Sequence, residues 1–495
     1  MRAKIKVDPE RQIGPISPLI YGQFLSRRWG VAERGLHDPE HPKARPDGIR
    51  VDVLEKIIEA RPTVIRWPGG CTGTTYHWQD GIGKSRPRKL DLHFGFPATY
   101  DFGTDEFVAF CREVGAEPLI VWAMAVSTID EGMAWLEYCN GSADTYYANL
   151  RRANGHEEPY RVKFWQIGNE MYGRHEIGHM SSAEYAAVAR EWAKTAKRVD
   201  PAIKIIAVGG TTRDINWYFD PLREAGEFVD YISMHTYWGL NGQDAGYEAI
   251  VFGPNFTEEV VADVARVINI VRREKRLRHN IGLAFTEWNA WRPHTHGMRE
   301  AGEPYQPDYR LTEALAVAAF INVMHRQCRT ITLATVAQTL NVVGLLTVNA
   351  EGVVVEPVYW PLWMARRVAG EISLDVWLEC EGTVAREVGS GAEKDVPYLD
   401  VAATLDPEGG RIVISAVNRH PSEEAETELV LSDTELAPRA RAYILYHDDA
   451  QAMNTLAEPE NVSPRVEEVT VAGPRFSYAF LPHSYTLLEL FLSKG

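Results

Sequence analysis

The sequence has too few basic residues to balance its acidic ones, and it contains no long uninterrupted apolar segment. Its 52 lysines and arginines stand against 68 aspartates and glutamates, which gives a net charge of −16 at pH 7. A negative surface repels nucleic acids and anionic membranes, so we expect neither as a partner. No segment approaches the roughly 18 consecutive apolar residues that span a bilayer, and the first residues lack the apolar core of a secretion signal. We therefore expect a cytoplasmic protein that acts on a small or neutral substrate.

Cysteine is also scarce. The chain has five cysteines, scattered and without a Cys-x-x-Cys pair. This spacing indicates neither a disulfide framework nor a zinc knuckle, so we expect mostly reduced, buried thiols. We predict no metal and no cofactor. The five are Cys71, Cys111, Cys139, Cys328 and Cys380.

Short apolar runs alternate with amphipathic segments from Pro18 to about Gly344. This alternation is typical of repeated strand and helix units around a parallel sheet. Eight strands over roughly 250 residues or more favour a closed (β/α)₈ TIM barrel over an open sheet. The predicted strands are Leu19–Leu25, Thr63–Pro68, Pro118–Ala125, Val162–Gly168, Ile203–Val208, Val229–His235, Leu283–Trp288 and Ile331–Gln338. The predicted helices include Val51–Ala60, Asp105–Val114, Ser182–Arg198, Thr257–Arg276 and Leu311–Arg326.

The pattern changes after about Arg367 to alternating strand-like runs separated by Pro, Gly, Asp and Glu, which indicates an antiparallel β-sandwich. We predict a catalytic barrel over residues 15–366 and a sandwich domain over residues 1–14 plus 367–495, to which Ala3–Val7 adds a strand. The other predicted sandwich strands are Tyr398–Thr404, Arg411–Val417, Thr427–Leu431, Ala440–Leu445, Val466–Val471 and Ser477–Leu490.

Polar side chains gather at the C-terminal ends of the predicted barrel strands, where barrels of this type carry their functional residues. Glu170 follows the fourth strand and Glu287 lies near the end of the seventh. A single carboxylate at a strand end often caps the next helix. Two carboxylates, each beside an Asn or a Trp, instead favour glycoside hydrolysis, which needs one acid and one group that meets the developing cation. The other polar candidates at strand ends are Arg66, His235, Tyr237 and Gln338.

Several motifs resemble those of glycoside hydrolase family 51, which consists mainly of α-L-arabinofuranosidases. In the barrel they are Tyr21–Phe24, Arg66–Gly70, Tyr76–Gly83, Phe102–Phe107, Gly168–Glu170, Thr286–Asn289 and Ala337–Asn341, and in the sandwich Val417–Pro421 and Pro482–Thr486. The resemblance implies a retaining mechanism and a homo-oligomer, a trimer or a hexamer. It also implies Glu170 as acid/base, Glu287 as nucleophile, Asn169 as donor to the sugar 2-hydroxyl, and Tyr237 and Gln338 as pocket residues.

The two glutamates need different environments for these roles. Glu170 must start protonated, so we expect a raised pKa, with Met171, Tyr172 and Trp165 as apolar walls. Glu287 must stay ionised, so we expect hydrogen-bond donors beside it, and His235 and Tyr237 are the candidates. 

The chain departs from the family pattern at three positions of the sugar subsite. Ser26 stands where a glutamate usually holds sugar hydroxyls, Cys71 where an asparagine is common, and Phe94 where a tryptophan is usual. We still include these three residues, with Arg66, His235 and Trp291, among the candidate substrate-binding residues. Arg27 and Arg28 fit either an anionic sugar or structural roles such as an ion pair.

Residues 175–179 read His-Glu-Ile-Gly-His and match the H-E-x-x-H zinc motif. That motif needs a regular helix, whereas this segment contains Gly178 and lies directly after the Glu170 turn, so we interpret it as a loop. The sequence therefore predicts an exo-acting α-L-arabinofuranosidase that acts on oligosaccharides from hemicellulose or pectin. The alternatives are a β-xylosidase, a galactofuranosidase or an endo-glucanase on the same scaffold, or a non-catalytic sugar-binding protein.

Overall fold

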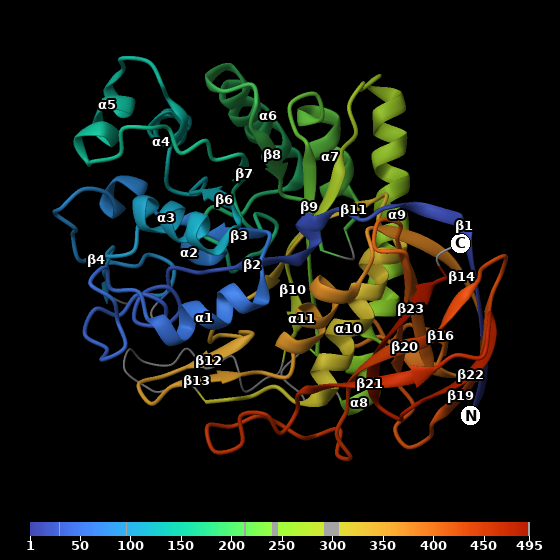
Figure 1. The fold of residues 1–495 in the computed structure, drawn as a ribbon. Coiled ribbons are helices and arrows are strands. Elements are labelled where there is room, and N and C mark those ends of the chain that lie inside the picture. The colour runs from blue at the N-terminus through green and yellow to red at the C-terminus, as the bar shows by residue number, and fades with distance from the viewer. Residues whose placement is uncertain (29, 96, 212–213, 240–245, 292–305, 494–495) are drawn as a thin grey trace.

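A computed structural model describes residues 1–28, 30–95, 97–211, 214–239, 246–291 and 306–493. Eight parallel strands close into a barrel in the order β10-β11-β2-β3-β6-β7-β8-β9 (Figure 1). Their bounds are β2 Gly22–Phe24, β3 Val64–Trp67, β6 Glu117–Trp122, β7 Phe164–Ile167, β8 Lys204–Ala207, β9 Tyr231–Trp238, β10 Gly282–Ala290 and β11 Ile331–Ala337. Each predicted strand overlaps one of these, so the predicted TIM barrel is confirmed. The first predicted strand, Leu19–Leu25, began too early, because Pro18–Tyr21 form a 3₁₀ turn.

The helices surround the barrel where the amphipathic pattern placed them. Two predicted helices, Val51–Ala60 and Leu311–Arg326, have the bounds of α1 and α10, and the other three overlap α3, α6 and α9. The helix bounds are α1 Val51–Ala60, α2 Cys71–Thr74, α3 Thr104–Val114, α4 Ile129–Asn140, α5 Tyr146–Ala153, α6 Ser182–Val199, α7 Asn216–Ala225, α8 Gly246–Val251, α9 Gly253–Glu274, α10 Leu311–Arg326 and α11 Tyr359–Val368. Within the described residues, no helix combines the length and the apolar character that crossing a membrane requires.

A nine-stranded sheet, antiparallel except where β1 pairs with β19, forms the second unit in the order β21-β20-β23-β18-β17-β14-β1-β19-β22. It has its own apolar core. The strand β1 pairs with β14 and β19, so the predicted strand at Ala3–Val7 is confirmed. The bounds are β1 Arg2–Pro15, β14 Ile372–Cys380, β17 Leu399–Asp406, β18 Arg411–Asn418, β19 Ala425–Leu431, β20 Leu436–Leu445, β21 Pro464–Thr470, β22 Arg475–Phe480 and β23 Ser484–Leu492. The predicted run Ser477–Leu490 is therefore two strands.

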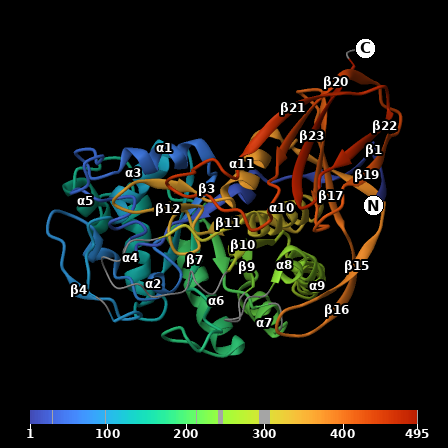
Figure 2. The same ribbon diagram turned by 90° about the horizontal axis from the view of Figure 1, so that it is seen from below.

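The helix α10 joins the two units (Figure 2). Every residue of α10 up to His325 is buried, and two of its polar side chains bond to the sheet. The Asn322 amide donates to Asp400 Oδ1 at 2.8 Å, and Arg326 forms an ion pair with the same carboxylate at 3.0 Å. The predicted domain limits, residues 14/15 and 366/367, stay a prediction, and the ends of β1 and α11 lie beside them. 

Six short strands in three pairs complete the description. The hairpin of β15 Gly382–Arg386 and β16 Glu393–Pro397 extends from the sheet along the barrel (Figure 2). The strands β12 Leu346–Val348 and β13 Val353–Val355 pair with each other beyond β11, and β4 Lys89–Leu90 pairs with β5 Pro97–Ala98 in the segment between β3 and β6. This last segment supplies residues to the candidate site.

Candidate functional site

Glu170 and Glu287 meet at the C-terminal ends of the barrel strands. One carboxylate oxygen of each, with a ring nitrogen of His235, lies within 4.8 Å of the others. Retaining glycosidases hold their carboxyl groups about 5–5.5 Å apart, whereas inverting enzymes need roughly 6.5–9.5 Å to admit a water molecule. Two carboxylate oxygens this close fit the shorter of these separations, which the retaining mechanism implied by the resemblance requires. Glu170 also has a left-handed backbone (φ 44°), a conformation that costs about 1–3 kcal/mol and that clusters at functional sites.

A buried cation holds the Glu287 carboxylate. Arg66 is fully buried and donates to Glu287 Oε1 at 2.8 Å, while the Tyr237 hydroxyl donates to Oε2 at 2.7 Å. The same guanidinium donates to Gln166 at 3.0 Å and to Asn169 at 2.5 Å. Tyr237 therefore donates to Glu287, as we expected. Substrate binding by Arg66 stays a prediction, and in this structure its fully buried guanidinium bonds to Glu287 and to the two amides.

Hydrogen-bond donors surround the Glu170 carboxylate. Oε1 accepts from the Tyr172 hydroxyl at 3.0 Å and lies 2.8 Å from His235 Nδ1, while Oε2 lies 2.8 Å from His175 Nε2. Burial raises the pKa of Glu170, but the hydrogen bonds from His175 and His235 outweigh it and hold this pKa well below its usual range. The expected raised pKa is therefore wrong for this state of the site. 

The contacts of one histidine thus differ from the prediction, and those of a second were not predicted. His235 contacts Glu170 and stays 3.9 Å from Glu287, because its Nε2 is held by the Thr286 hydroxyl at 2.8 Å. The contact of His175 with Glu170 was missed, although a histidine five residues after a carboxylate in a tight loop was a usable signal. The hydrogen bond to Glu170 raises the pKa of His175.

The H-E-x-x-H segment has no helix. Residues 171–180, all of them described, form turns, and Gly178 has a left-handed backbone (φ 78°). His175 bonds to Glu170, while Glu176 points into the protein and is fully buried. Its Oε1 accepts from Asn169 Nδ2 at 2.9 Å, so Arg66 and Glu176 together fix the orientation of the Asn169 amide. The segment is therefore the loop that supports Asn169 and Glu170.

The other candidates lie around this centre. The Trp291 ring packs edge-on against the Tyr237 ring, with 4.5 Å between centroids. Gln338 follows β11, and its buried Oε1 has no hydrogen-bond partner among the described residues. The Ser26 hydroxyl is buried against the Thr72 hydroxyl at 3.1 Å. Cys71 opens α2 close to Glu176.

The remaining candidates, Phe94 and the two arginines, belong to the loops next to Cys71. The Arg28 guanidinium lies over the Phe94 ring at 4.8 Å from its centroid. Arg27 is buried and forms an ion pair with Asp91 at 2.6 Å. Of the two predicted roles of Arg27, the structural one is confirmed, because a buried and paired guanidinium does not reach a sugar.

Gly70 leaves room for the Glu287 carboxylate. A Cβ atom added at Gly70 would lie 2.5 Å from Glu287 Oε1, closer than a Cβ contact allows, although the backbone of Gly70 has a negative φ. Three residues later, a Cβ at Gly73 would meet its nearest neighbour, Val121 Cγ1, at an ordinary 3.5 Å. The two glycines therefore make a matched pair for a test of the site.

We expect Gly70→Ala to lower kcat/KM by about 100-fold, because displacing a reacting carboxylate by about 1 Å costs this much. Gly73→Ala should keep activity close to that of the wild type. Steady-state kinetics on an aryl glycoside and a thermal melt of both variants provide the measurement. Equal activity of Gly70→Ala and Gly73→Ala, with both folded, would contradict the placement of Glu287 against Gly70.

Two close carboxylates at the mouth of a (β/α)₈ barrel, one held by arginine and the other by histidines, define a retaining glycoside hydrolase. Two family models match the chain, the alpha-L-arabinofuranosidase 1 domain over residues 56–249 and the alpha-L-arabinofuranosidase C-terminal domain over residues 286–484. The chain belongs to glycoside hydrolase family 51, the family of the α-L-arabinofuranosidases.

Individual relatives are similar to this chain over nearly its whole length. Alpha-L-arabinofuranosidase C of Emericella nidulans is 34% identical, over 98% of this chain and 97% of the relative. Intracellular exo-alpha-(1->5)-L-arabinofuranosidase 1 of Bacillus subtilis is 31% identical, over 99% of both chains. The solved structure of the thermostable GH51 alpha-L-arabinofuranosidase from Thermotoga petrophila is 34% identical and superposes with a TM-score of 0.88, over 98% of this chain and 99% of that chain.

Proposed function

We propose that the protein is an exo-acting α-L-arabinofuranosidase that removes terminal arabinofuranosyl groups from oligosaccharides of hemicellulose or pectin. The observation that carries this proposal is the close pair of Glu170 and Glu287 carboxylates, each with its own set of hydrogen-bond partners. The names of the relatives from Emericella nidulans and Bacillus subtilis support the sugar and, for the latter, exo action.

Glu287 is the nucleophile in this proposal. Its carboxylate attacks the anomeric carbon while the bond to the leaving oxygen breaks, and a covalent glycosyl-enzyme forms. Arg66 and Tyr237 donate to the two oxygens of Glu287 and so favour its charged form. Water then attacks the same carbon, the ester bond to Glu287 breaks, and the sugar leaves with its original configuration.

Glu170 is the acid and then the base. Because its pKa is lowered and that of His175 is raised, we assign one proton to the hydrogen-bonded pair that they form. In the first step this proton passes through Glu170 to the leaving oxygen. In the second step Glu170 takes a proton from the attacking water. The ionised carboxylate of this structure is the form that the second step needs.

Side chains around the two carboxylates bind the sugar. The second hydrogen of Asn169 Nδ2 donates to the 2-hydroxyl, while Gln338 Oε1 accepts from another hydroxyl and Tyr237 lines the pocket. The predicted contribution of Ser26, Cys71, Phe94 and Trp291 to the surrounding walls also remains part of the proposal. No anionic sugar is included, since Arg27 is buried with Asp91.

A panel of nitrophenyl glycosides tests the substrate. The α-L-arabinofuranoside should be hydrolysed with a kcat/KM at least about 100-fold above that for the β-D-xyloside or the β-D-galactofuranoside, because a site built for particular hydroxyls rejects other arrangements strongly. Linear arabino-oligosaccharides should release only the monosaccharide. A preference for xyloside, galactofuranoside or internal glucan bonds would establish one of the alternatives, and no hydrolysis at all would favour a sugar-binding protein.

We also propose a cytoplasmic homo-oligomer, a trimer or a hexamer, without nucleic acid or membrane partners. The charge of −16 and the name of the intracellular Bacillus subtilis relative support this part. The oligomeric state itself rests on the resemblance to the family. Sedimentation equilibrium of the full chain measures it directly.

A further inference from the structure

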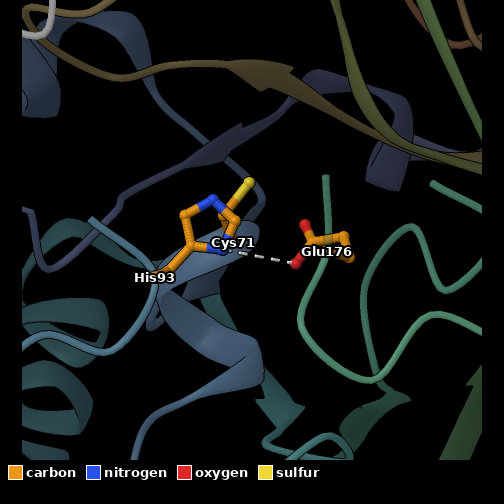
Figure 3. Close-up of side chains that lie close together, drawn as sticks. All are labelled: Cys71, His93 and Glu176. Carbon is orange, nitrogen blue, oxygen red and sulfur yellow. Dashed lines mark ion pairs between the residues drawn. The ribbon is translucent and has the colours of Figure 1, made fainter. Parts of the chain in front are cut away.

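A cluster of three side chains beside the two glutamates is not used by the reaction steps above. Cys71 lies at the start of α2, His93 between β4 and β5, and Glu176 in the loop after β7. Their Sγ, one ring nitrogen and one carboxylate oxygen all lie within 4.8 Å of one another. Figure 3 shows the three side chains converging from these separate segments. Thiolate, imidazole and carboxylate are the ligands that zinc takes in proteins.

Within this cluster, the ring nitrogen of His93 is available to a metal ion. His93 Nδ1 is buried, makes no hydrogen bond to any described residue, and lies 3.8 Å from Glu176 Oε2. Burial lowers the pKa of His93, which favours the neutral imidazole that binds metals. Two other groups of candidate ligands occur among the described residues, and both contain Glu170, which the reaction steps above already use.

The loop around His93 is held in place by a buried ion pair. Asp91 Oδ1 accepts from the backbone N–H groups of His93 at 2.9 Å and Phe94 at 3.0 Å, and Asp91 Oδ2 pairs with Arg27 at 2.6 Å. On the opposite side, the Thr74 hydroxyl donates to Glu176 Oε2 at 3.1 Å. The donor atoms are thus positioned by partners outside the cluster, as in built metal sites.

We propose that Cys71 Sγ, His93 Nδ1 and Glu176 Oε2 form a binding site for a thiophilic divalent cation such as Zn²⁺ or Cd²⁺, which inhibits the enzyme. Ligand atoms around a tetrahedral zinc ion are about 3.3–3.6 Å apart, so the 3.8 Å between His93 and Glu176 closes by a few tenths of an ångström. Binding forms three bonds to the metal and releases the Cys71 thiol proton to solvent. The thiolate selects against Mg²⁺ and Ca²⁺.

The inhibition, unlike the binding, rests on the proposed function. Cys71 and Phe94, the neighbour of His93, are proposed walls of the sugar pocket. An ion with its water molecule therefore competes with the sugar for this part of the pocket. We expect KM to rise with the metal concentration while kcat stays unchanged.

Cd²⁺ titration of the full chain tests the binding without any substrate, because cadmium bound to a thiolate absorbs in the ultraviolet. The wild type should bind one Cd²⁺ with this charge-transfer band. Cys71→Ser should lose the band and bind at least about 100-fold more weakly, since even an outer-shell partner contributes about 10–100-fold. Cys380→Ser, which removes a half-buried thiol of the sheet, is the matched control and should behave as the wild type. 

His93→Ala is the second variant and should also weaken binding while it keeps the fold by circular dichroism. The proposal is overturned if the wild type shows no band, or if Cys71→Ser and His93→Ala bind as tightly as the wild type. Binding with the band in a protein that hydrolyses no arabinofuranoside supports the metal site and counts only against the proposed function.

Discussion

Glu287→Ala should lower the rate of hydrolysis of every glycoside, natural or activated, by at least about 10⁴-fold. Without this carboxylate no glycosyl-enzyme forms, and loss of a nucleophile in other covalent enzymes costs this much or more. Added azide should rescue part of the activity on an aryl glycoside, because the small anion fits where the side chain was removed. Since azide then attacks from the face that Glu287 occupied, the glycosyl azide should have inverted configuration, which nuclear magnetic resonance shows.

The loss of activity in Glu287→Ala must be separated from unfolding, because this variant leaves Arg66 with one ionic partner fewer. Removal of one member of a buried ion pair costs about 3–5 kcal/mol, and Arg66 keeps its bonds to Gln166 and Asn169. Glu287→Gln, which keeps the volume, is the matched control and should be equally inactive with a melting temperature closer to that of the wild type. Full activity in either folded variant, or a rescued product of retained configuration, would contradict the assignment of Glu287.

The barrel was predictable because its strands repeat one local pattern. Each strand is a short apolar run followed by a helix with an apolar face. The spacing of apolar residues in a strand and in a helix can be read from neighbouring residues. In the second unit the same reasoning placed β17, β18 and β20 but missed β14 and the hairpin of β15 and β16. Few residues of these strands are fully buried, so their alternation is weak, and the pairing of β14 depends on β1 at the other end of the chain.

The position of the two glutamates was predictable, but their partners were not. The rule that barrels carry function at the C-terminal ends of strands needs only the order of elements, and it identified Glu170 and Glu287. Which side chain bonds to which carboxylate depends on distances between strands. His235 was expected beside Glu287, and the strand register does pair the two residues, yet the Thr286 hydroxyl holds Nε2 of the ring and Nδ1 contacts Glu170.

The direction of the pKa shift of Glu170 could not be predicted from the sequence either. A raised pKa followed from the required role and from apolar neighbours in the sequence. The loop after β7 instead folds back and places His175 against the carboxylate. Loop conformation of this kind depends on left-handed residues such as Gly178, whose effect on side-chain direction cannot be read from spacing.

Glu170→Ala should fail in a different way from Glu287→Ala. The variant lacks the proton donor, so glycosides with poor leaving groups should lose about 10²–10⁴-fold in kcat/KM, the usual contribution of general acid catalysis. Dinitrophenolate needs little protonation to leave. On the dinitrophenyl arabinofuranoside the glycosyl-enzyme should therefore still form, but its hydrolysis should stall, because no base activates the water.

Azide distinguishes this variant because it needs no base. It should speed the turnover of Glu170→Ala on the activated substrate and yield a glycosyl azide of retained configuration, since it attacks the intermediate on Glu287 from the vacated acid/base side. Mass spectrometry should detect the trapped intermediate in the absence of azide. His179→Ala, which alters the other histidine of the same loop, is the control and should keep wild-type kinetics. If Glu170→Ala gave the inverted azide and Glu287→Ala the retained one, the two roles would be exchanged. If neither variant lost activity, the reaction would not take place between these two carboxylates.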